Sequence, residues 1–571
     1  MSLLSRMRAW PASPSWFILP LIAIALAALG CGENEDDVPI DLILWNGRVV
    51  TLDPARPEGQ AVAVRGSLIA AVGSNSEILA MAGPATRRID LQGQMVIPGL
   101  VDAHGHVLWL GNRLGELDLR GAANIETIAA RVAEKARALP AGTWITGGGW
   151  DQNLWPGGEF PSHAPLTAAA PEHPVWLSRV DEHAAWANRK AMELAGVTHE
   201  TQAPEGGSIE RDAAGAPTGV FIDNAMDLVA HARPAATKEE IKASLQRALQ
   251  RCAEVGLTEV HDAGVTPAMV DAYRELADER KLPVRVYLMW DGTEAGRGVE
   301  PLLEQEPFVN YRDRLTLRAL KLMIDGAMGS RGAAFLRDYE DAPGSRGHLV
   351  TSGEDIERLA ALAMQKGYQV CTHAIGDRGI GLTLDAYEKA LATAGADDPR
   401  PRIEHLQCTT QEDIRRLQAL HGIASMQPGH ATSDMYWAEE RIGHQRALGC
   451  YAWRWVLDAG VPIAAGSDFP VELERPVIGL MAAVTRQDAR RNPEGGWHPE
   501  QRMTLDEALR AYTTAAAYAA FQEKLKGRIA PGLWADLTVL SEDLRQINPT
   551  SIHRVSVGYT IVGGQVIYEV P

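Results

Sequence analysis

The stretch VIPGLVDAHGH at residues 96–106 decides the interpretation of this chain. It begins with the apolar residues of a buried strand and ends with two histidines separated by one glycine. Side chains two residues apart in a strand share a face, so His104 and His106 are expected to point the same way. Two neutral imidazoles placed in this way can bind one divalent ion. The alternative is a pair of hydrogen-bonded surface histidines in a loop, and the motif alone leaves both open.

Further buried strands follow, with helical stretches between them, which is the pattern of a parallel sheet. The eight expected strands cover residues 95–106, 256–264, 283–290, 317–326, 368–377, 402–407, 422–430 and 462–470. Eight such units predict an α/β fold, a (β/α)8 TIM-like barrel over residues 95–526. The chemistry of such a barrel lies at the C-terminal ends of its strands.

Both ends of the mature chain are rich in short β-forming runs. Residues 40–94 contain Asn46-Gly47, a strong hairpin signal, and residues 527–571 contain further runs of this kind. We expect one composite β-sandwich domain built from these two segments. The gap between the first two barrel strands is too long for one helix, which predicts an inserted segment at 140–235, over or beside the barrel mouth.

The first 30 residues have the character of a secretory signal. Arg6 and Arg8 precede the apolar run at 16–30, which is short for a membrane span. Gly30-Cys31 resembles a bacterial lipobox, so residues 1–30 are expected to be a lipoprotein signal peptide and 31–39 an acidic tether. Lipidation at Cys31 would anchor the protein to the membrane of the bacterial cell envelope, facing the periplasm or as an outer-membrane lipoprotein. Ordinary secretion and an uncleaved anchor are the alternatives.

Charge and cysteine spacing narrow the function further. The formal net charge of −18 disfavours nucleic acid as a partner. The cysteines beyond Cys31 show no CxxC pair, so buried free thiols are expected at Cys252, Cys371, Cys408 and Cys450. The oligomeric state is left open, a homo-oligomer included.

Three further potential ligands stand at or near the ends of expected barrel strands: His373, His405 and Asp468. Each alone is more often a hydrogen-bonded core residue. At one end of one barrel they would converge with His104 and His106, and histidine with carboxylate suits zinc and its neighbours.

Lys321 is unusual for a barrel strand. Alternation in LRALKLMIDG, residues 317–326, turns it towards the barrel interior. A buried ammonium beside a metal is costly, and a lowered pKa relieves that cost. The neutral amine could form a Schiff base, or take up carbon dioxide to become a carbamate that bridges two metals. Alternatively, Lys321 reaches the rim or pairs with Asp325.

These motifs together resemble the amidohydrolase superfamily, and specifically its YtcJ-like branch (amidohydrolase family 3). PGLVDAHGH, KLMIDGAMGSRGA, THAIGD, RIEHLQ, AAGSDFPV and GRIAPGLWADLTVL carry the resemblance, with WDQNLW and DEHAAWAN in the insertion. It implies a hydrolase that uses a divalent metal, most simply zinc, with one or two ions. It assigns the ligand positions to His104, His106, Lys321 as a carbamate, His373, His405 and Asp468.

The expected reaction is hydrolysis of a non-peptide carbon–nitrogen bond in a small-molecule substrate. Asp468 would be the general base and acid, with Lys321 and His183 as further catalytic groups. His183 or His373 would hold the oxyanion. The substrate-binding candidates are Trp150, Trp155, His183, Trp186, Asp325, Arg331 and Gln427. For the tryptophans, a packed cap over the barrel is the alternative.

Two other functions fit the same residues. The first is hydrolysis of an ester, lactone or phosphoester, because an activated water attacks carbonyl and phosphoryl centres alike. The second is an envelope lipoprotein that only binds a metal or ligand. The presence of Asp468 and Lys321 argues against a protein that only binds, since binding alone needs no base.

Overall fold

The computed structural model describes residues 39–152, 155–179, 184–204, 207–293 and 298–570. The expected signal peptide, the tether as far as residue 38, Cys31 and His183 lie outside these ranges. Within them, no helix combines the length and the apolar character that crossing a membrane requires.

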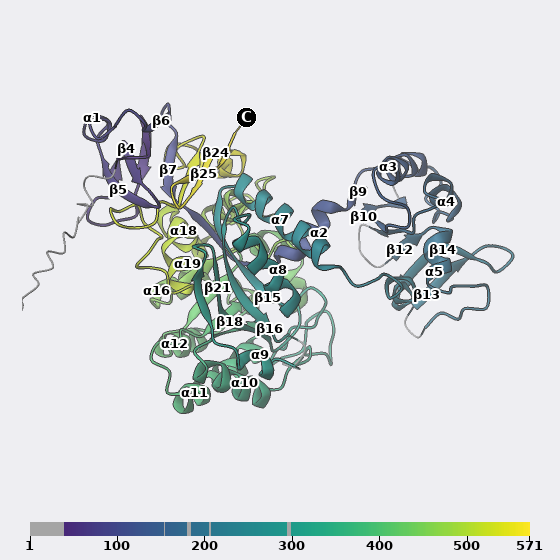
Figure 1. Ribbon diagram of the computed structural model, residues 1–571. Coiled ribbons are helices and arrows are strands. Elements are labelled where there is room, and N and C mark those ends of the chain that lie inside the picture. The colour runs from purple at the N-terminus through teal and green to yellow at the C-terminus, as the bar shows by residue number, and fades with distance from the viewer. Residues whose placement is uncertain (1–38, 153–154, 180–183, 205–206, 294–297, 571) are drawn as a thin grey trace, which may run out of the picture. The chain divides into compact units, whose positions relative to one another are not determined.

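Eight parallel strands form the central sheet. In chain order they are β8 (Leu100–Gly105), β15 (Leu257–Val265), β16 (Arg285–Asp291), β18 (Leu315–Met323), β19 (Gln369–Ala374), β20 (Arg402–His405), β21 (Ile423–Met426) and β22 (Ile463–Ala465). Of these, β15, β16, β18 and β21 are labelled in Figure 1, and the short β17 (Phe308–Tyr311) pairs antiparallel with β18. The ring nearly closes, because Gly105 bridges Phe469 just beyond β22. The predicted (β/α)8 barrel is confirmed.

The helices between these strands show why the sequence alternates. In α10 (Gly353–Gln365), Ser352 caps the first turn by accepting from Asp355 N. Its buried residues, Ile356, Leu359, Ala360 and Ala363, follow the helical repeat and form one apolar face. The other helices of this layer include α8 (Pro267–Asp278), α11 (Asp377–Ala394), α12 (Gln411–Ala419), α16 (Trp453–Asp458), α17 (Pro476–Thr485), α18 (Leu505–Ala511) and α19 (Thr514–Ala519). The apolar strands and helix faces share one large core.

The expected single strand at 95–106 is wrong, because the chain changes sheets within it. Residues Met95–Pro98 form β7, which pairs with β23 (Leu537–Leu540), and β8 starts only at Leu100. Pro98 has no N–H to continue a ladder. At Gly99 a Cβ atom would lie 2.2 Å from Thr258 Oγ1, so only glycine allows this close crossing. Gly99 therefore joins the terminal domain to the barrel.

Two sheets from the chain ends pack face to face. One contains β1 (Leu42–Trp45), β4 (Ala61–Arg65), β5 (Leu68–Gly73) and β6 (Arg87–Asp90). The other contains β2 (Arg48–Val50), β3 (Glu58–Gly59), β7, β23, β24 (Val557–Val562) and β25 (Gln565–Glu569). Apolar residues of both sheets share one core. In Figure 1 the purple N-terminal strands accordingly lie beside the yellow C-terminal ones.

The segment between α2 (Val107–Gly115) and α7 (Lys238–Glu254) forms its own mixed sheet. Its strands are β9 (Leu117–Asp118), β10 (Ile145–Trp150), β11 (Val175–Arg179), β12 (Ala184–Ala187), β13 (Gly207–Arg211) and β14 (Pro217–Asp223). Helices α3 (Ile125–Arg137), α4 (Ala164–Ala169), α5 (Arg189–Leu194) and α6 (Asp227–Ala230) accompany it. Separate apolar clusters on the two sides of this sheet give it cores of its own.

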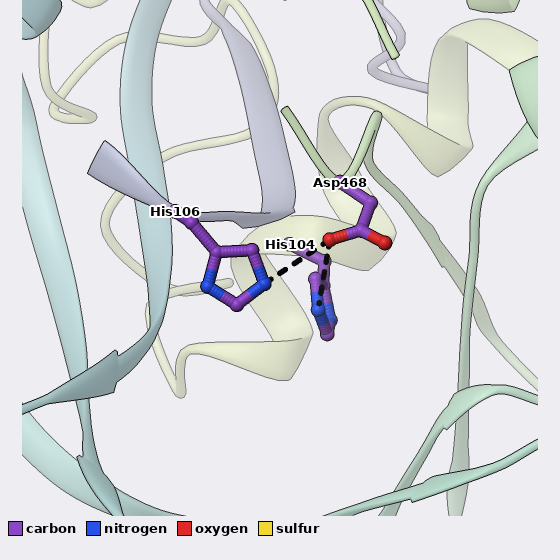
Figure 2. Close-up of side chains that lie close together, drawn as sticks. All are labelled: His104, His106 and Asp468. Atoms are coloured by element: carbon purple, nitrogen blue, oxygen red, sulfur yellow. Dashed lines mark ion pairs between the residues drawn. The ribbon is translucent and has the colours of Figure 1, made fainter. Parts of the chain in front are cut away.

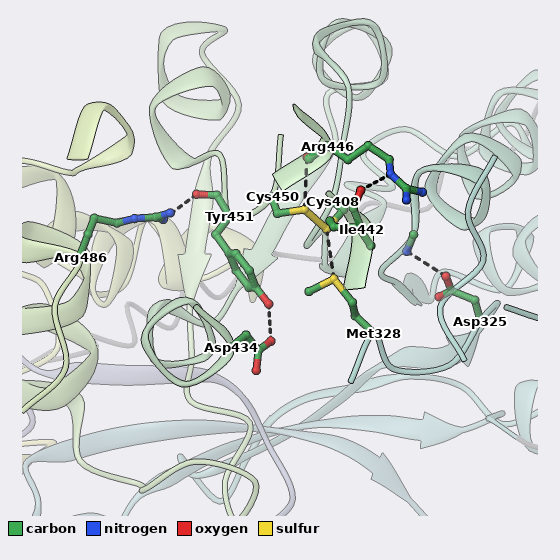
Figure 3. The surroundings of a disulfide bond; sticks show 10 residues. Asp325, Met328, Cys408, Asp434, Ile442, Arg446, Cys450, Tyr451 and Arg486 are labelled. Atoms are coloured by element: carbon green, nitrogen blue, oxygen red, sulfur yellow. Dashed lines mark hydrogen bonds between the residues drawn. A yellow bond between two sulfur atoms is a disulfide. The ribbon is translucent and has the colours of Figure 1, made fainter. Parts of the chain in front are cut away.

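A disulfide joins Cys408 to Cys450, which corrects the expectation of free thiols at these two positions. Cys408 follows β20, and Cys450 lies between α15 (His444–Ala447) and α16 (Figure 3). The fold brings cysteines that are 42 residues apart into a local β-bridge, and linear spacing does not reveal such a pairing. Cys252 and Cys371 are free and buried, as expected.

Candidate metal centre

His104, His106 and Asp468 meet at the barrel mouth (Figure 2). His104 lies on β8, His106 precedes the first turn of α2, and Asp468 follows β22. Asp468 Oδ1 lies 3.2 Å from His106 Nε2 and 3.6 Å from His104 Nε2. The backbone fixes this arrangement, since Asp468 N donates to His104 O at 2.7 Å. These ligand-type atoms lie within 4.8 Å of one another, as a shared ion requires.

His373 and His405 complete the histidine cluster from the next strands. The His405 ring centroid lies 4.7 Å from that of His104 and 4.5 Å from that of His373. His405 has a φ of 72° and Asp468 one of 62°, both in the left-handed region that non-glycine residues seldom adopt. Such strain persists where the surrounding structure holds it, and it gathers at functional sites.

His430 is a further member that the sequence analysis missed. The expected strand 422–430 ends at Met426, because Pro428 starts α13 (Pro428–Asp434). The Nε2 atom of His430 lies 3.7 Å from Asp468 Oδ2, and Gln407 Nε2 lies 3.2 Å from His430 Nδ1. The position of His430 in the sequence could have indicated it. His430 follows the seventh barrel strand, as Asp468 follows the eighth.

Lys321 lies inside the barrel on β18, as the alternation predicts, with 3% of its surface exposed. Its Nζ atom is 3.2 Å from His104 Nε2. The alternative pairing with Asp325 is not formed, because that carboxylate accepts backbone N–H groups of Ala334, Ile375 and Gly376. Burial lowers the pKa of Lys321, which favours the neutral, nucleophilic amine.

Behind His104 lies a buried acid–base pair that the sequence analysis did not identify. Glu404 Oε2 is 2.6 Å from His104 Nδ1, and Arg402 Nε is 2.8 Å from Glu404 Oε1. All three side chains are fully buried. A carboxylate can only accept a hydrogen bond, so the proton of neutral His104 lies on Nδ1. Its Nε2 is then unprotonated and has a lone pair directed towards the barrel mouth. Alternation of RIEH, residues 402–405, could have indicated that Arg402 and Glu404 share a face.

The pKa values of His104, His373 and His405 are all lowered, which favours the neutral form that a metal ligand needs. Burial and the nearby Lys321 lower the pKa of His104 to about 4 and that of His373 to about 3. Burial and His373 lower the pKa of His405 well below its ordinary value. Burial alone would raise the pKa of Asp468, but the His106 hydrogen bond and the surrounding imidazoles hold it well below the usual range.

The donor set fits a divalent ion of the zinc type, since it combines imidazole nitrogens with a carboxylate. One observation supports this fit. The Nε2 atoms of His373 and His430 are buried and have no hydrogen-bond partner among the described residues. Leaving such atoms unsatisfied costs about 1–3 kcal/mol each. An ion, or a ligand beside it, would satisfy them.

A cavity of about 590 Å³ opens directly on this cluster. His106, Lys321, His373, His405 and Asp468 line it, so the candidate ligands face a space of substrate size. Its remaining wall includes Trp109, Met269, Met323, Met328, Trp437 and Val471. The pocket therefore joins a polar floor to a largely apolar wall.

The three tryptophans proposed for substrate binding lie elsewhere. Trp150, Trp155 and Trp186 pack in one apolar core of the inserted sheet. The Trp150 ring centroid lies 5.8 Å from that of Trp155 and 6.1 Å from that of Trp186. These contacts are those of the packed-core alternative, and none of the three lines the cavity described above.

The remaining substrate-binding candidates have partners of their own. Asp325 is fully buried under its three backbone donors. Arg331 pairs with Asp341, with Nη2 at 2.8 Å from Oδ2. Gln427 Oε1 lies 2.8 Å from His405 Nδ1, so it orients a candidate ligand. Substrate contact by these residues stays a prediction.

A parallel eight-stranded barrel with histidines and a carboxylate at the C-terminal ends of its strands defines a metal-dependent hydrolase class. The chain belongs to the amidohydrolase family, whose model matches residues 87–568.

Relatives cover nearly the whole chain. It is 31% identical to the protein YtcJ of Bacillus subtilis (strain 168), over 92% of this chain and 99% of that protein. It is 29% identical to N-substituted formamide deformylase of Arthrobacter pascens, over 93% of this chain and 98% of that protein. An uncharacterised metal-dependent hydrolase of Pyrococcus horikoshii OT3 has a solved structure that matches with a TM-score of 0.74. That match has 27% identity and covers 89% of this chain and 99% of the other.

Proposed function

We propose that this enzyme hydrolyses the carbon–nitrogen bond of an N-acyl amine, with Asp468 as the general base and acid. The convergence of Asp468 with His104, His106 and His430 carries the proposal, since all of these except His104 line one cavity. The formamide deformylase relative supports an amide-type bond and suggests formamides as first probes.

The proposed ligands are His104, His106, His373, His405, Asp468 and a carbamate formed on Lys321. The chemistry that a divalent ion supplies in such a site is a lowered pKa of water and a polarised carbonyl. Burial lowers the pKa of Lys321, which favours the neutral amine that adds carbon dioxide, and the resulting anion would remove the like-charge cost beside a metal.

Asp468 is placed to move the proton. Its low pKa keeps the carboxylate ionised and able to accept a proton from the attacking water. It would then deliver this proton to the departing amine, because the carboxyl group faces the cavity in which the substrate lies. His373 is a candidate to hold the oxyanion only where its Nε2 carries a proton and binds no ion, because a ligating nitrogen has no hydrogen to donate. This Nε2 makes no hydrogen bond among the described residues. His183 remains a second candidate.

The test compares N-formylpentylamine with pentyl formate on the metal-loaded protein. We expect hydrolysis of the formamide and a loss of about 100-fold or more in kcat for Asp468→Asn, the usual range for a general base. Asp397→Asn is a matched control, since Asp397 is exposed between α11 and β20. Hydrolysis of the ester alone would replace the amidase proposal with the esterase alternative. Unchanged turnover in Asp468→Asn, at equal metal content, would remove Asp468 from the mechanism.

We further propose that the protein is exported and lipidated at Cys31. The support is the sequence of residues 1–31, with its basic start, apolar run and Gly30-Cys31 junction. Metabolic labelling with a fatty-acid analogue in a bacterial host should mark the wild-type protein and leave Cys31→Ser unmarked. Labelling of both proteins, or of neither, would contradict lipidation at this residue.

A further inference from the structure

The cavity has a negatively charged end that the proposed chemistry does not use. Asp434 is the last residue of α13, and Glu472 lies in the segment after β22. Each accepts one hydrogen bond within the described chain: Tyr451 Oη donates to Asp434, and Ser433 Oγ donates to Glu472 Oε1 at 2.5 Å. No described lysine or arginine forms an ion pair with either carboxylate.

These two carboxylates line the same cavity and act on each other through their charges. Burial raises the pKa of Asp434, while His430 and the Tyr451 hydrogen bond offset part of that rise and the Glu472 charge adds a smaller increase. Two like charges in a partly buried wall disfavour each other, whereas a cation bound between them would be attracted by both. The folded protein therefore gains from a positively charged occupant at this end of the pocket.

A buried histidine whose Nε2 makes no hydrogen bond lies between this end of the cavity and the candidate metal centre. His430 is 6% exposed, and its Nε2 atom lacks a hydrogen-bond partner among the described residues. His430 and Asp434 stand four residues apart on α13, so they lie on one face with a spacing of about 6 Å along the axis. Since His430 contacts Asp468, the negative end lies about one helical turn from the reacting groups.

Aromatic faces line the same space. Trp109 is 58% exposed, stacks on His106 with centroids 4.4 Å apart, and faces the cavity together with Trp437. Aromatic faces attract organic cations, most strongly those of tryptophan. Apart from histidines, Lys321 is the sole basic residue among the described residues that line the cavity. The described wall thus offers a substrate carboxylate no guanidinium and no free ammonium.

We propose that the pocket selects N-acyl amines with a second, cationic amino group about 6 Å from the scissile bond, as in N-acylated diamines, and that Asp434 and Glu472 bind this ammonium. This specificity rests on the proposed N-acyl amine hydrolysis. It assigns Asp434 and Glu472 a role in substrate recognition, separate from the metal ligands.

The test is a matched series of formamides that differ only in the terminal group. N-formylputrescine is cationic, N-formylpentylamine is its neutral isostere, and δ-formamidovalerate is the anionic counterpart. We expect kcat/KM for the cationic substrate to exceed that for the neutral one by about tenfold or more, with the anion slowest. Glu472→Gln and Asp434→Asn should each reduce this ratio to below about threefold. Glu440→Gln, an exposed glutamate outside the cavity wall, should leave it unchanged.

A binding measurement separates failure of the specificity from failure of the proposed function. Calorimetry with pentylammonium and with pentanol needs no hydrolysis. Tighter binding of the ammonium, lost in Glu472→Gln, supports the cation site even if no formamide is hydrolysed. Equal kcat/KM for the three formamides, or a preference for the anion, overturns the inference while leaving amide hydrolysis established. Equal binding of ammonium and alcohol overturns it as well.

Discussion

At the residue scale, the contact between Glu404 and His104 controls the candidate centre. The carboxylate fixes the tautomer of the imidazole, and Arg402 balances the buried negative charge. Partners of this kind typically change metal affinity by about 10–100-fold when they are removed.

We therefore expect Glu404→Gln to weaken zinc binding about tenfold or more, because a neutral amide accepts from Nδ1–H more weakly than a carboxylate and can present its NH₂ group instead. It should also lower the free energy of unfolding by about 3 kcal/mol, since Arg402 loses its buried partner. Competition with a chromogenic chelator measures the affinity, and Asp397→Asn serves as the control. Equal zinc affinity in Glu404→Gln and wild type would show that Glu404 does not orient the ligand.

The low pKa values of the buried histidines give a pH prediction. In the metal-free protein, His104 and His373 should stay neutral down to about pH 5, where exposed histidines are already protonated. Their folded-state pKa values lie below the unfolded value, so protons favour the unfolded chain. Their contribution to stability is therefore present above about pH 6.5 and is lost as the pH falls towards 4. Nitrogen-15 spectra of the imidazoles test this, and protonation of both near pH 6.5 would disprove it.

Lys321 provides a prediction through chemical rescue. Lys321→Ala should lose activity by about 100-fold or more if a carbamate from this residue completes the centre. Added acetate or propionate should restore part of the activity, because a small carboxylate can enter the vacated space and supply similar oxygen atoms. Full activity in Lys321→Ala, or in Lys321→Arg without added carboxylate, would exclude the carbamate.

At the element scale, the turns after the barrel strands determine where the ligands point. Arg402 and Glu404 face the barrel interior, so simple alternation would send His405 the other way. The positive φ of His405 instead turns its ring towards His104 and His373. Strand periodicity predicts the strand and the presence of a histidine at its end. It does not predict this backbone turn, because tertiary contacts with neighbouring strands impose the left-handed conformation.

The disulfide gives a second prediction at this scale. Cys408 and Cys450 close a loop with a sequence separation of 42, for which loop entropy predicts a stabilisation of about 4 kcal/mol. Cys450→Ser should lower the free energy of unfolding by up to this amount in urea titrations. A reductant should destabilise wild type to a similar degree and leave Cys450→Ser unaffected. The account of this bond fails if reductant leaves the stability of wild type unchanged.

At the scale of the whole molecule, the repeated alternation of apolar strands and amphipathic helices made the barrel predictable. The strand ends then indicated where chemistry gathers, which led to His104, His373 and Asp468. Contacts that depend on three-dimensional folding were missed: the His430 contact with Asp468, the Glu404–Arg402 pair, and the disulfide. For the tryptophans of the insertion, substrate contact and core packing were both left open, and Trp150, Trp155 and Trp186 pack in a core. Aromatic residues serve cores and binding sites equally well, and composition does not separate the two.

The central claim is that the barrel mouth is a metal centre completed by Lys321. X-ray diffraction from crystals of the zinc-loaded protein, with data collected at the zinc edge, tests it most directly. We predict an anomalous peak enclosed by His104, His106, His373, His405 and Asp468, with carbamate density on the Lys321 amine. A zinc-loaded crystal without a peak at the mouth, or with a peak only at the separate group of Glu439, His444 and His498, would contradict the account.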